Sequence, residues 1–153
     1  MRYFLASILI LSLAGCDVVG PTLLTGPVAG DASTDAVINA SVSVLQQEGY
    51  TVITADRNTG VVTTDWRAES SYAGQIFLDT SRRTRISLVL DFFTDQIQVQ
   101  MTKQKKEGES PWRNDDLSDN DRSQMQIILN RVQERALAIQ SQLNSEGEAG
   151  SGV

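Results

Sequence analysis

Few side chains in this sequence can carry out covalent or acid–base chemistry, and their identities limit what the protein can do. The chain contains one cysteine, Cys16, and no histidine. The lack of histidine removes the commonest general base and metal ligand, and every Ser-His or Cys-His arrangement for nucleophilic catalysis. A lone cysteine forms no intramolecular disulfide and no thiolate cluster. We therefore expect a protein that is not an enzyme and has no catalytic residues, no cofactor and no metal site.

Carboxylates are the remaining candidates for acid–base chemistry. Asp115 and Asp116 are adjacent, and Asp119 and Asp121 follow shortly after them. A glycosidase needs two carboxyl groups at a fixed separation across a cleft, and a calcium site needs several convergent oxygens. The spacing does not fit an EF-hand loop, and no P-loop, GxSxG or nucleotide-binding glycine motif occurs. These aspartates are more simply explained as loop residues and as negative charge at a helix N-terminus.

Basic side chains gather beside two predicted strands. They are Arg82, Arg83 and Arg85 near the start of one strand, and Lys103, Lys105 and Lys106 at the end of the next. If the strands form a hairpin, its open end collects positive charge. Such a cluster is a candidate binding surface for an acidic protein, an anionic saccharide or anionic lipid head groups. The favoured alternative is a solvated sheet end at which lysines discourage edge pairing.

Trp112, beside Pro111 in a polar segment, is the other candidate for partner binding. Tryptophan is enriched among the residues that contribute most to protein interfaces. The same side chain could instead fold back and cover the sheet, and the sequence leaves both alternatives open. Trp66 and Tyr72 are predicted to belong to the rim of the core.

The N-terminal segment predicts where the protein is located. Arg2 precedes an apolar run over residues 3–13 that is too short to span a membrane core of about 30 Å but is typical of a secretory signal peptide. The run ends in Leu13-Ala14-Gly15-Cys16, which resembles the lipobox of bacterial lipoproteins. The resemblance implies that residues 1–15 are removed and that the acylated Cys16 anchors the protein to a cell membrane, facing the periplasm. Asp17 resembles the inner-membrane retention signal of enteric bacteria, with a plain linker residue as the alternative.

Composition argues for one small acidic domain. Without residues 1–15 the chain loses Arg2, so 12 basic residues face 19 acidic ones and the net charge is 12 − 19 = −7. This balance argues against a general nucleic-acid partner, because such binding depends on neutralising phosphates. We expect a flexible tether over residues 16–31, a single α+β domain over 32–143 and a disordered tail over 144–153.

Two helices are predicted, one before and one after the strands. Ser33 or Thr34 can cap a helix that Gly49 ends. Near the C-terminus, Ser118 and Asp121 form a pair like a capping box. Apolar residues with helical spacing follow this pair: Met125, Ile128, Leu129, Val132, Ala136, Ile139 and Leu143.

Two hairpins are predicted between the helices. Residues 50–56 and 61–67 are rich in β-branched and aromatic side chains and flank a turn that ends in glycine. Residues 84–92 and 97–103 alternate apolar and polar side chains, which is typical of a sheet with one wet face. Residues 75–79 are either a short strand or a covering loop. The order α-β-β-β-β-α predicts an α+β two-layer sandwich, a four-stranded antiparallel sheet with both helices on one face.

Part of this pattern resembles the BamC-like helix-grip modules of envelope lipoproteins. The shared features are the Gly49-Tyr50-x-Val52 start, the turn from Asp56 to Gly60, and the pair Asp65-Trp66 at a strand end. The resemblance implies a role like that of the outer-membrane assembly machinery. That family carries two such modules and this chain has room for one, so no functional residue is carried over.

Three functions are compatible with these sequence features. The first is a lipid-anchored cell-envelope protein that binds another envelope protein as a non-catalytic assembly accessory. The alternative is a periplasmic carrier of a small ligand or lipid, with a pocket between the final helix and the sheet. The least favoured is an envelope hydrolase that uses only carboxylates.

Overall fold

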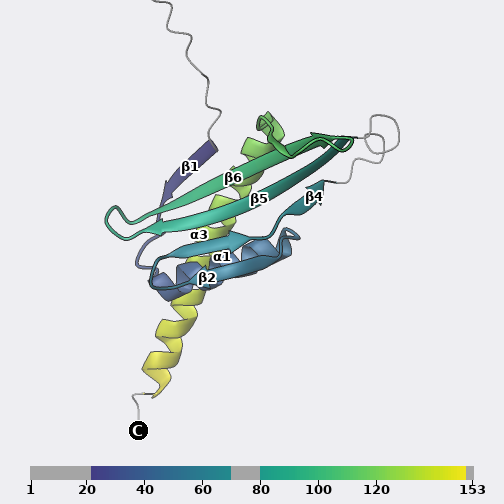
Figure 1. The fold of residues 1–153 in the computed structure, drawn as a ribbon. Coiled ribbons are helices and arrows are strands. Elements are labelled where there is room, and N and C mark those ends of the chain that lie inside the picture. Colours follow the sequence, from purple (N-terminus) through teal and green to yellow (C-terminus); the bar gives the residue numbers. More distant parts are fainter. Residues whose placement is uncertain (1–21, 70–79, 151–153) are drawn as a thin grey trace, which may run out of the picture.

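The protein is an α+β fold in which two helices pack on one antiparallel sheet (Figure 1). The structure, a computed structural model, describes residues 22–69 and 80–150, without the side chains of 147–150. The predicted signal peptide, Cys16, Asp17, Tyr72 and residues 75–79 lie outside this part of the chain. The elements are β1 Thr22–Pro27, α1 Thr34–Gln47, β2 Val52–Asp56, β3 Val61–Thr64, β4 Arg67–Glu69, β5 Thr80–Asp91, β6 Gln96–Glu107, β7 Arg113–Asn114 and α3 Asp119–Gly150.

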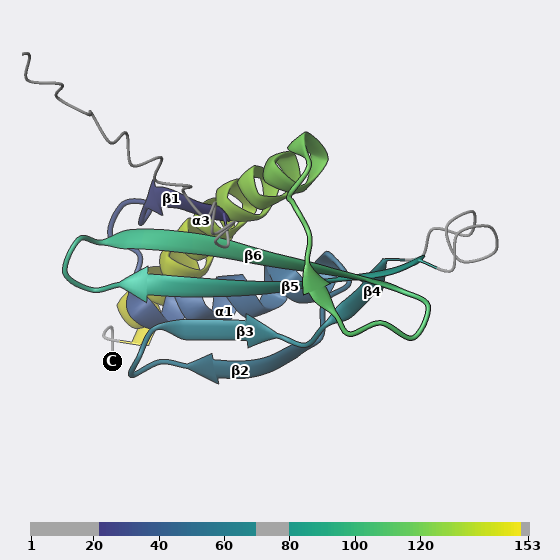
Figure 2. The same ribbon diagram turned by 45° about the horizontal axis from the view of Figure 1, so that its top comes forward.

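The sheet has seven strands and not the four that the sequence predicted. Its main order is β1-β6-β5-β3-β2, which can be followed in Figure 2. β4 pairs with the start of β5, and β7 pairs with the end of β6. The predicted hairpins are present as β2–β3 and β5–β6, all antiparallel. β5 and β6 are each 12 residues long and extend beyond the predicted strands into the basic segments.

The strand β1 replaces part of the predicted tether. Residues 22–27 pair with β6 from Thr22 opposite Met101 to Pro27 opposite Gln96. Pro27 fits at the end of β1 because β1 is an edge strand, where a missing backbone N–H can face solvent. Leu24 packs against the core, and Gly26 lies where a Cβ atom would come within 2.8 Å of the Leu129 side chain. The prediction of a flexible segment was wrong for these residues because their partner strand is remote in sequence.

Helix α1 begins and ends as its sequence predicts. The Ser33 hydroxyl accepts a hydrogen bond from the backbone N–H of Ala36, which satisfies one free donor of the first turn. Gly49 follows the helix with a φ of +79°, a conformation that glycine adopts at little cost. The helix buries Val37, Val44 and Leu45 against the sheet and α3.

Helix α3 has the predicted capping box and is longer than predicted. The Asp121 backbone N–H donates to the Ser118 hydroxyl (3.2 Å), and the Ser118 N–H donates to Asp121 Oδ2 (2.8 Å). The predicted apolar stripe is buried from Met125 to Ala136, Ile139 is half-buried, and Leu143 is 49% exposed. The expected disordered tail was wrong up to Gly150, because the helix continues past the sheet (Figure 1).

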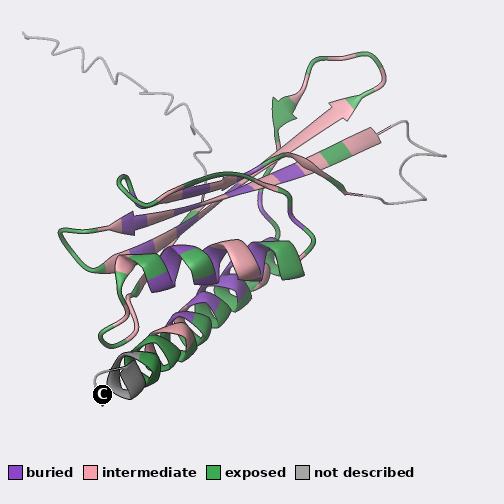
Figure 3. Cartoon of the chain, turned by 90° about the horizontal axis from the view of Figure 1, so that it is seen from below, coloured by how far each residue is buried: buried purple, intermediate pink, exposed green. Residues whose placement is uncertain are grey.

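The core lies between one face of the sheet and the two helices, whose buried sides are coloured in Figure 3. The sheet contributes alternate residues, among them Ile86, Leu88, Ile97 and Val99. We call this the helix side of the sheet, and the opposite surface the outer face. Phe92 was expected to continue the inward series, but β5 ends at Asp91 and Phe92 is 45% exposed. In the described part of the chain, no helix is both long and apolar enough to cross a membrane.

Candidate functional site

The extension of β5 and β6 divides the predicted basic cluster between the two faces of the sheet. Successive residues of a strand point to opposite faces, and residues paired across strands share a face. Arg82 is paired with Lys105, and Thr84, which is buried on the helix side, with Lys103. These basic side chains therefore belong to the helix side. Arg83, Arg85 and Lys106, one position out of phase, belong to the outer face.

The basic side chains of the helix side are neutralised by carboxylates. Lys103 Nζ lies 2.9 Å from Asp121 and 3.3 Å from Glu69. Arg82 and Lys105 both approach Asp115, at 3.2 and 3.5 Å. Asp115 is held there because its backbone N–H bonds to the Lys103 carbonyl oxygen. The helix-side half of the predicted basic cluster therefore takes part in ion pairs that stabilise the fold.

The basic side chains of the outer face stack on tryptophans instead. The Arg83 guanidinium lies between two indole rings, 4.4 Å from the centre of Trp66 and 4.1 Å from that of Trp112. Arg85 lies 4.9 Å from the Trp66 ring, and Lys106 Nζ lies 5.5 Å from the Trp112 ring. We call this row, Arg85–Trp66–Arg83–Trp112–Lys106, the cation–aromatic ladder. Each such contact stabilises a partly exposed site by about 0.5–1 kcal/mol.

A one-residue register shift places Trp66 in this ladder. Val61 to Thr63 pair with Val89 to Ser87, but Arg67 pairs with Thr84, one residue out of step with the earlier pairing. The extra residue at Asp65-Trp66 has the effect of a β-bulge, which re-aims the side chains that follow it. Trp66 consequently meets Arg83 and Arg85 on the outer face, while Arg67 points to the helix side.

β7 places Trp112 at the other end of the ladder. Arg113 pairs with Lys105 and Asn114 with Gln104, so Trp112 follows in register opposite Lys106. Trp112 is half-buried and folded back on the sheet, which is one of the two alternatives that the sequence left open. The Gln104 side-chain oxygen accepts hydrogen bonds from Arg83 Nε (3.0 Å) and Nη2 (2.8 Å) and fixes the central guanidinium.

Within residues 22–69 and 80–146, the positive charge of the ladder has no carboxylate partner. Among the residues that the structure describes, no carboxylate lies within ion-pair distance of Arg83, Arg85 or Lys106. The ladder therefore places cations that pair with no described carboxylate beside two aromatic rings, on a sheet face that no described helix covers (Figures 1 and 2). Sequence reasoning placed Trp66 in the core rim and missed its part in the ladder. The signal that could have indicated the ladder is the spacing of Arg83 and Arg85, since residues two apart on a strand lie on the same face of the sheet.

A second polar site lies on the helix side, where α3 begins. We call it the α3 pocket; its volume is about 280 Å³, and its lining includes Tyr50, Arg67, Glu69, Thr84, Lys103 and Asp121. Burial alone would raise the pKa of Asp121, but hydrogen bonds from Ser118 and Lys103 lower it below its ordinary value. Burial likewise opposes charge on Lys103, yet the contacts with Asp121 and Glu69 raise its pKa. Burial also raises the pKa of Tyr50, with opposition from Arg67.

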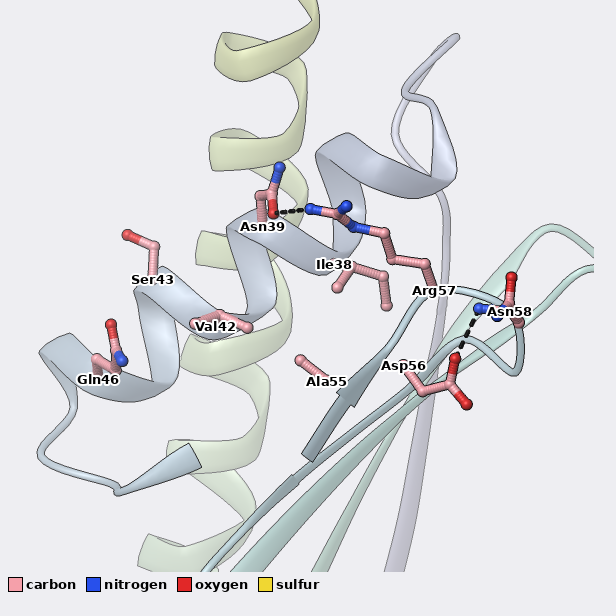
Figure 4. A pocket seen from close by; sticks show the side chains of 9 residues that line it. All are labelled: Ile38, Asn39, Val42, Ser43, Gln46, Ala55, Asp56, Arg57 and Asn58. Carbon is pink, nitrogen blue, oxygen red and sulfur yellow. Dashed lines mark hydrogen bonds between the residues drawn. The ribbon is translucent and has the colours of Figure 1, made fainter. Parts of the chain in front are cut away.

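A larger hollow lies between α1 and the β2–β3 turn (Figure 4), with a volume of about 580 Å³. It is an open groove, and none of the predicted site residues lines it. Arg57 bonds to Asn39 across the groove and forms an ion pair with Asp35 at 3.1 Å. These contacts show that polar side chains at the rim of the groove already bind one another and hold the β2–β3 turn against α1.

The described residues contain no group of three or more Cys, His, Asp or Glu side chains placed to hold a metal ion.

Compared with known proteins, the sequence matches no family model and no curated protein significantly. The resemblances to bacterial lipoproteins and to BamC-like modules therefore stay predictions.

Proposed function

We propose that this protein is a lipid-anchored, non-catalytic accessory of the cell envelope that binds another envelope protein through the cation–aromatic ladder. The observation that carries the proposal is the Arg83 guanidinium stacked between Trp66 and Trp112 on the outer face. A rigid row of tryptophan and arginine side chains presents the residue types that contribute most to protein interfaces.

The charges of the ladder support an acidic protein segment as the partner. The ladder's basic groups form no ion pair with a described carboxylate, in contrast to Lys103, Lys105 and Arg82 on the helix side. A charged side chain that is already stacked and fixed loses little conformational freedom when it binds. Gln104 and the indole rings supply this fixation.

The proposed anchor is an acyl group on Cys16, which would hold the domain at the periplasmic side of a membrane. Support comes from the signal-like run and from the sequence Leu13-Ala14-Gly15-Cys16. Asp17 favours the inner membrane over the outer one. The BamC-like features of residues 49–66 support a role in envelope assembly.

The proposal is tested by capturing the lipidated protein from its native envelope in mild detergent and identifying stoichiometric partners. Cys16→Ser is expected to leave the membrane fraction and to lose partners that depend on anchoring. Trp112→Ala and Arg85→Glu are expected to reduce capture at least several-fold, because each removes part of the ladder without breaking a core contact.

Matched controls separate the ladder from general effects of aromatic loss and charge reversal. Phe93→Ala removes a 99% exposed aromatic side chain at the opposite end of the β5–β6 hairpin. Arg135→Glu reverses an exposed charge on α3. Both controls should capture the partner normally. Equal capture by the ladder variants and these controls, with all variants folded, would refute the assignment of this surface.

A small-ligand carrier is the second candidate function, and one observation favours it. The hydroxyl of Thr84 is buried in the α3 pocket beside the Tyr50 side chain and makes no hydrogen bond of normal geometry to the described residues. This pocket adjoins both the sheet and the start of the final helix, where the sequence predicted a ligand site.

A further inference from the structure

The α3 pocket lies where the layer of helices ends and the sheet continues. α1 ends before Tyr50 and α3 begins at Asp119, and Figure 2 shows β5 and β6 continuing past these helix ends. The pocket is therefore walled by Tyr50, Arg67 and Asp121, with Thr84 on the strand beneath. Its volume of about 280 Å³ is just below the range typical of drug-sized ligand sites, so it suits a molecule with few heavy atoms.

The pocket lining has equal numbers of basic and acidic side chains, but some of their hydrogen-bonding atoms have no partner among the described residues. Asp121 Oδ2 accepts hydrogen bonds from Ser118 and Lys103, but its Oδ1 accepts none from the described residues. Arg67 Nη1 donates to the Glu48 carbonyl oxygen at 2.6 Å, and its other N–H groups bond to no described residue. Free guanidinium donors and a free carboxylate oxygen thus line the same small space.

The Thr84 hydroxyl gives an independent indication of a ligand. Thr84 is 2% exposed, and its Oγ1, whose polar neighbour is the Tyr50 side chain, makes no hydrogen bond of normal geometry to the described residues. A buried hydroxyl without a hydrogen bond costs about 1–3 kcal/mol. A site that keeps such a group beside free donors and acceptors is suited to a polar molecule that completes the hydrogen bonds.

We propose that the α3 pocket binds a small zwitterionic molecule of the free amino acid class. The ligand's carboxylate is bound by the Arg67 guanidinium, and its ammonium group by the free oxygens of Asp121 and Glu69. The Thr84 hydroxyl bonds to either end of the ligand. Since the pocket lining carries two basic residues, Arg67 and Lys103, and two acidic ones, Glu69 and Asp121, a dipolar ligand fits it better than an ion of one sign.

A lipid or other apolar ligand fits this pocket poorly. The face of the Tyr50 ring is covered by Arg67, whose guanidinium lies 3.9 Å from the ring centre. The binding activity is separate from partner capture by the ladder, which is on the outer face of the sheet. Each activity can consequently fail without the other.

The test is calorimetric titration of the full chain, carrying Cys16→Ser, with glycine and L-alanine. Acetate and methylammonium serve as probes with one charge each, and glycerol serves as a neutral polyol. We expect saturable binding of the amino acids with a rise in melting temperature, and at least tenfold weaker binding of the other probes.

Two variants localise the binding. Thr84→Val should weaken amino acid binding about fivefold because it removes one hydrogen bond, and Asp121→Asn should weaken it further. Thr102→Val, on the outer face of β6, is the matched control and should bind normally. Absence of amino acid binding at millimolar concentration, equal binding of glycerol, or unchanged affinity in folded Thr84→Val would each overturn the proposal.

Discussion

Replacing Asp121 by Asn is expected to destabilise the protein far more than the same change at Asp119, two residues earlier on α3. Asp121 Oδ2 accepts from the Ser118 N–H (2.8 Å), the Ser118 hydroxyl (2.7 Å) and Lys103 Nζ (2.9 Å). The side chains of Asp121 and Lys103 are only 12% and 11% exposed. An amide keeps an acceptor oxygen but not the charge, and Lys103 is left with Glu69 alone.

The expected loss is about 2 kcal/mol of unfolding free energy. Charge-assisted hydrogen bonds contribute about 1.5–3 kcal/mol and neutral ones about 1 kcal/mol. Breaking a fully buried pair costs about 3–5 kcal/mol, and the remaining Glu69 contact reduces that figure. Asp119 is fully exposed, and its one ion pair with a described residue is to Arg122 on its own helix, so Asp119→Asn should change little.

Urea unfolding at neutral pH measures both variants, with tryptophan fluorescence and circular dichroism as probes. The two substitutions make the same change of charge in the same helical turn, so their difference isolates the contacts of Asp121. Equal losses for the two variants would refute the reasoning, because the helix dipole alone would then explain both.

The difference in unfolding free energy between wild type and Asp121→Asn is expected to depend on pH. Hydrogen bonds from Ser118 and Lys103 outweigh burial and lower the pKa of Asp121 in the folded state. A depressed folded pKa gives stability that is complete above the unfolded pKa of about 4 and is lost as the pH falls through the folded pKa. The gap between wild type and Asp121→Asn should therefore shrink below about pH 4. A gap that is constant or widens on acidification would contradict this assignment.

Three further predictions concern the core, the hairpin and the buried hydroxyl, and each is measured by urea unfolding. Ile128→Ala should cost about 2–5 kcal/mol because its side chain is fully buried, while Ile127→Ala, at a position 43% exposed, should cost much less; similar losses would contradict the packing described. Gly60→Ala should destabilise more than Gly49→Ala: both glycines have positive φ, but only at Gly60 would a Cβ atom lie 2.7 Å from a backbone oxygen. Thr84→Val should leave stability unchanged or raise it by about 1 kcal/mol in the absence of ligand, since it removes an unpaired buried hydroxyl; a clear loss would indicate a hydrogen bond to Thr84.

Local signals in the sequence determined both helices and both hairpins. Ser33 and Ser118 act as caps because their hydroxyls reach backbone N–H groups three residues away. The β5–β6 alternation fixed which face is apolar, because side chains on a strand alternate with a period of two. Each of these features depends on residues a few positions apart, so no tertiary information was needed.

Tertiary structure decided the number of strands and the fate of the N-terminal segment. Residues 22–27 have no strand-like period of their own and form β1 because the edge of β6 offers backbone partners. β4 and β7 are three and two residues long and depend on pairing with the extended β5–β6 hairpin in the same way. Strands this short have too few residues for a periodic signal.

For the candidate sites too, some features followed from the sequence and others only from the tertiary structure. The sequence alone identified the basic residues, Trp112 and the signal-like segment ending at Cys16, since these depend only on residue types and spacing. It did not show that Arg83 stacks between two tryptophans while Lys103 is paired with Asp121, nor that Thr84 is buried without a partner. Those outcomes depend on the length of β5 and β6 and on the one-residue shift at Asp65-Trp66. Both arise from backbone pairing between remote segments, which only the folded chain brings together.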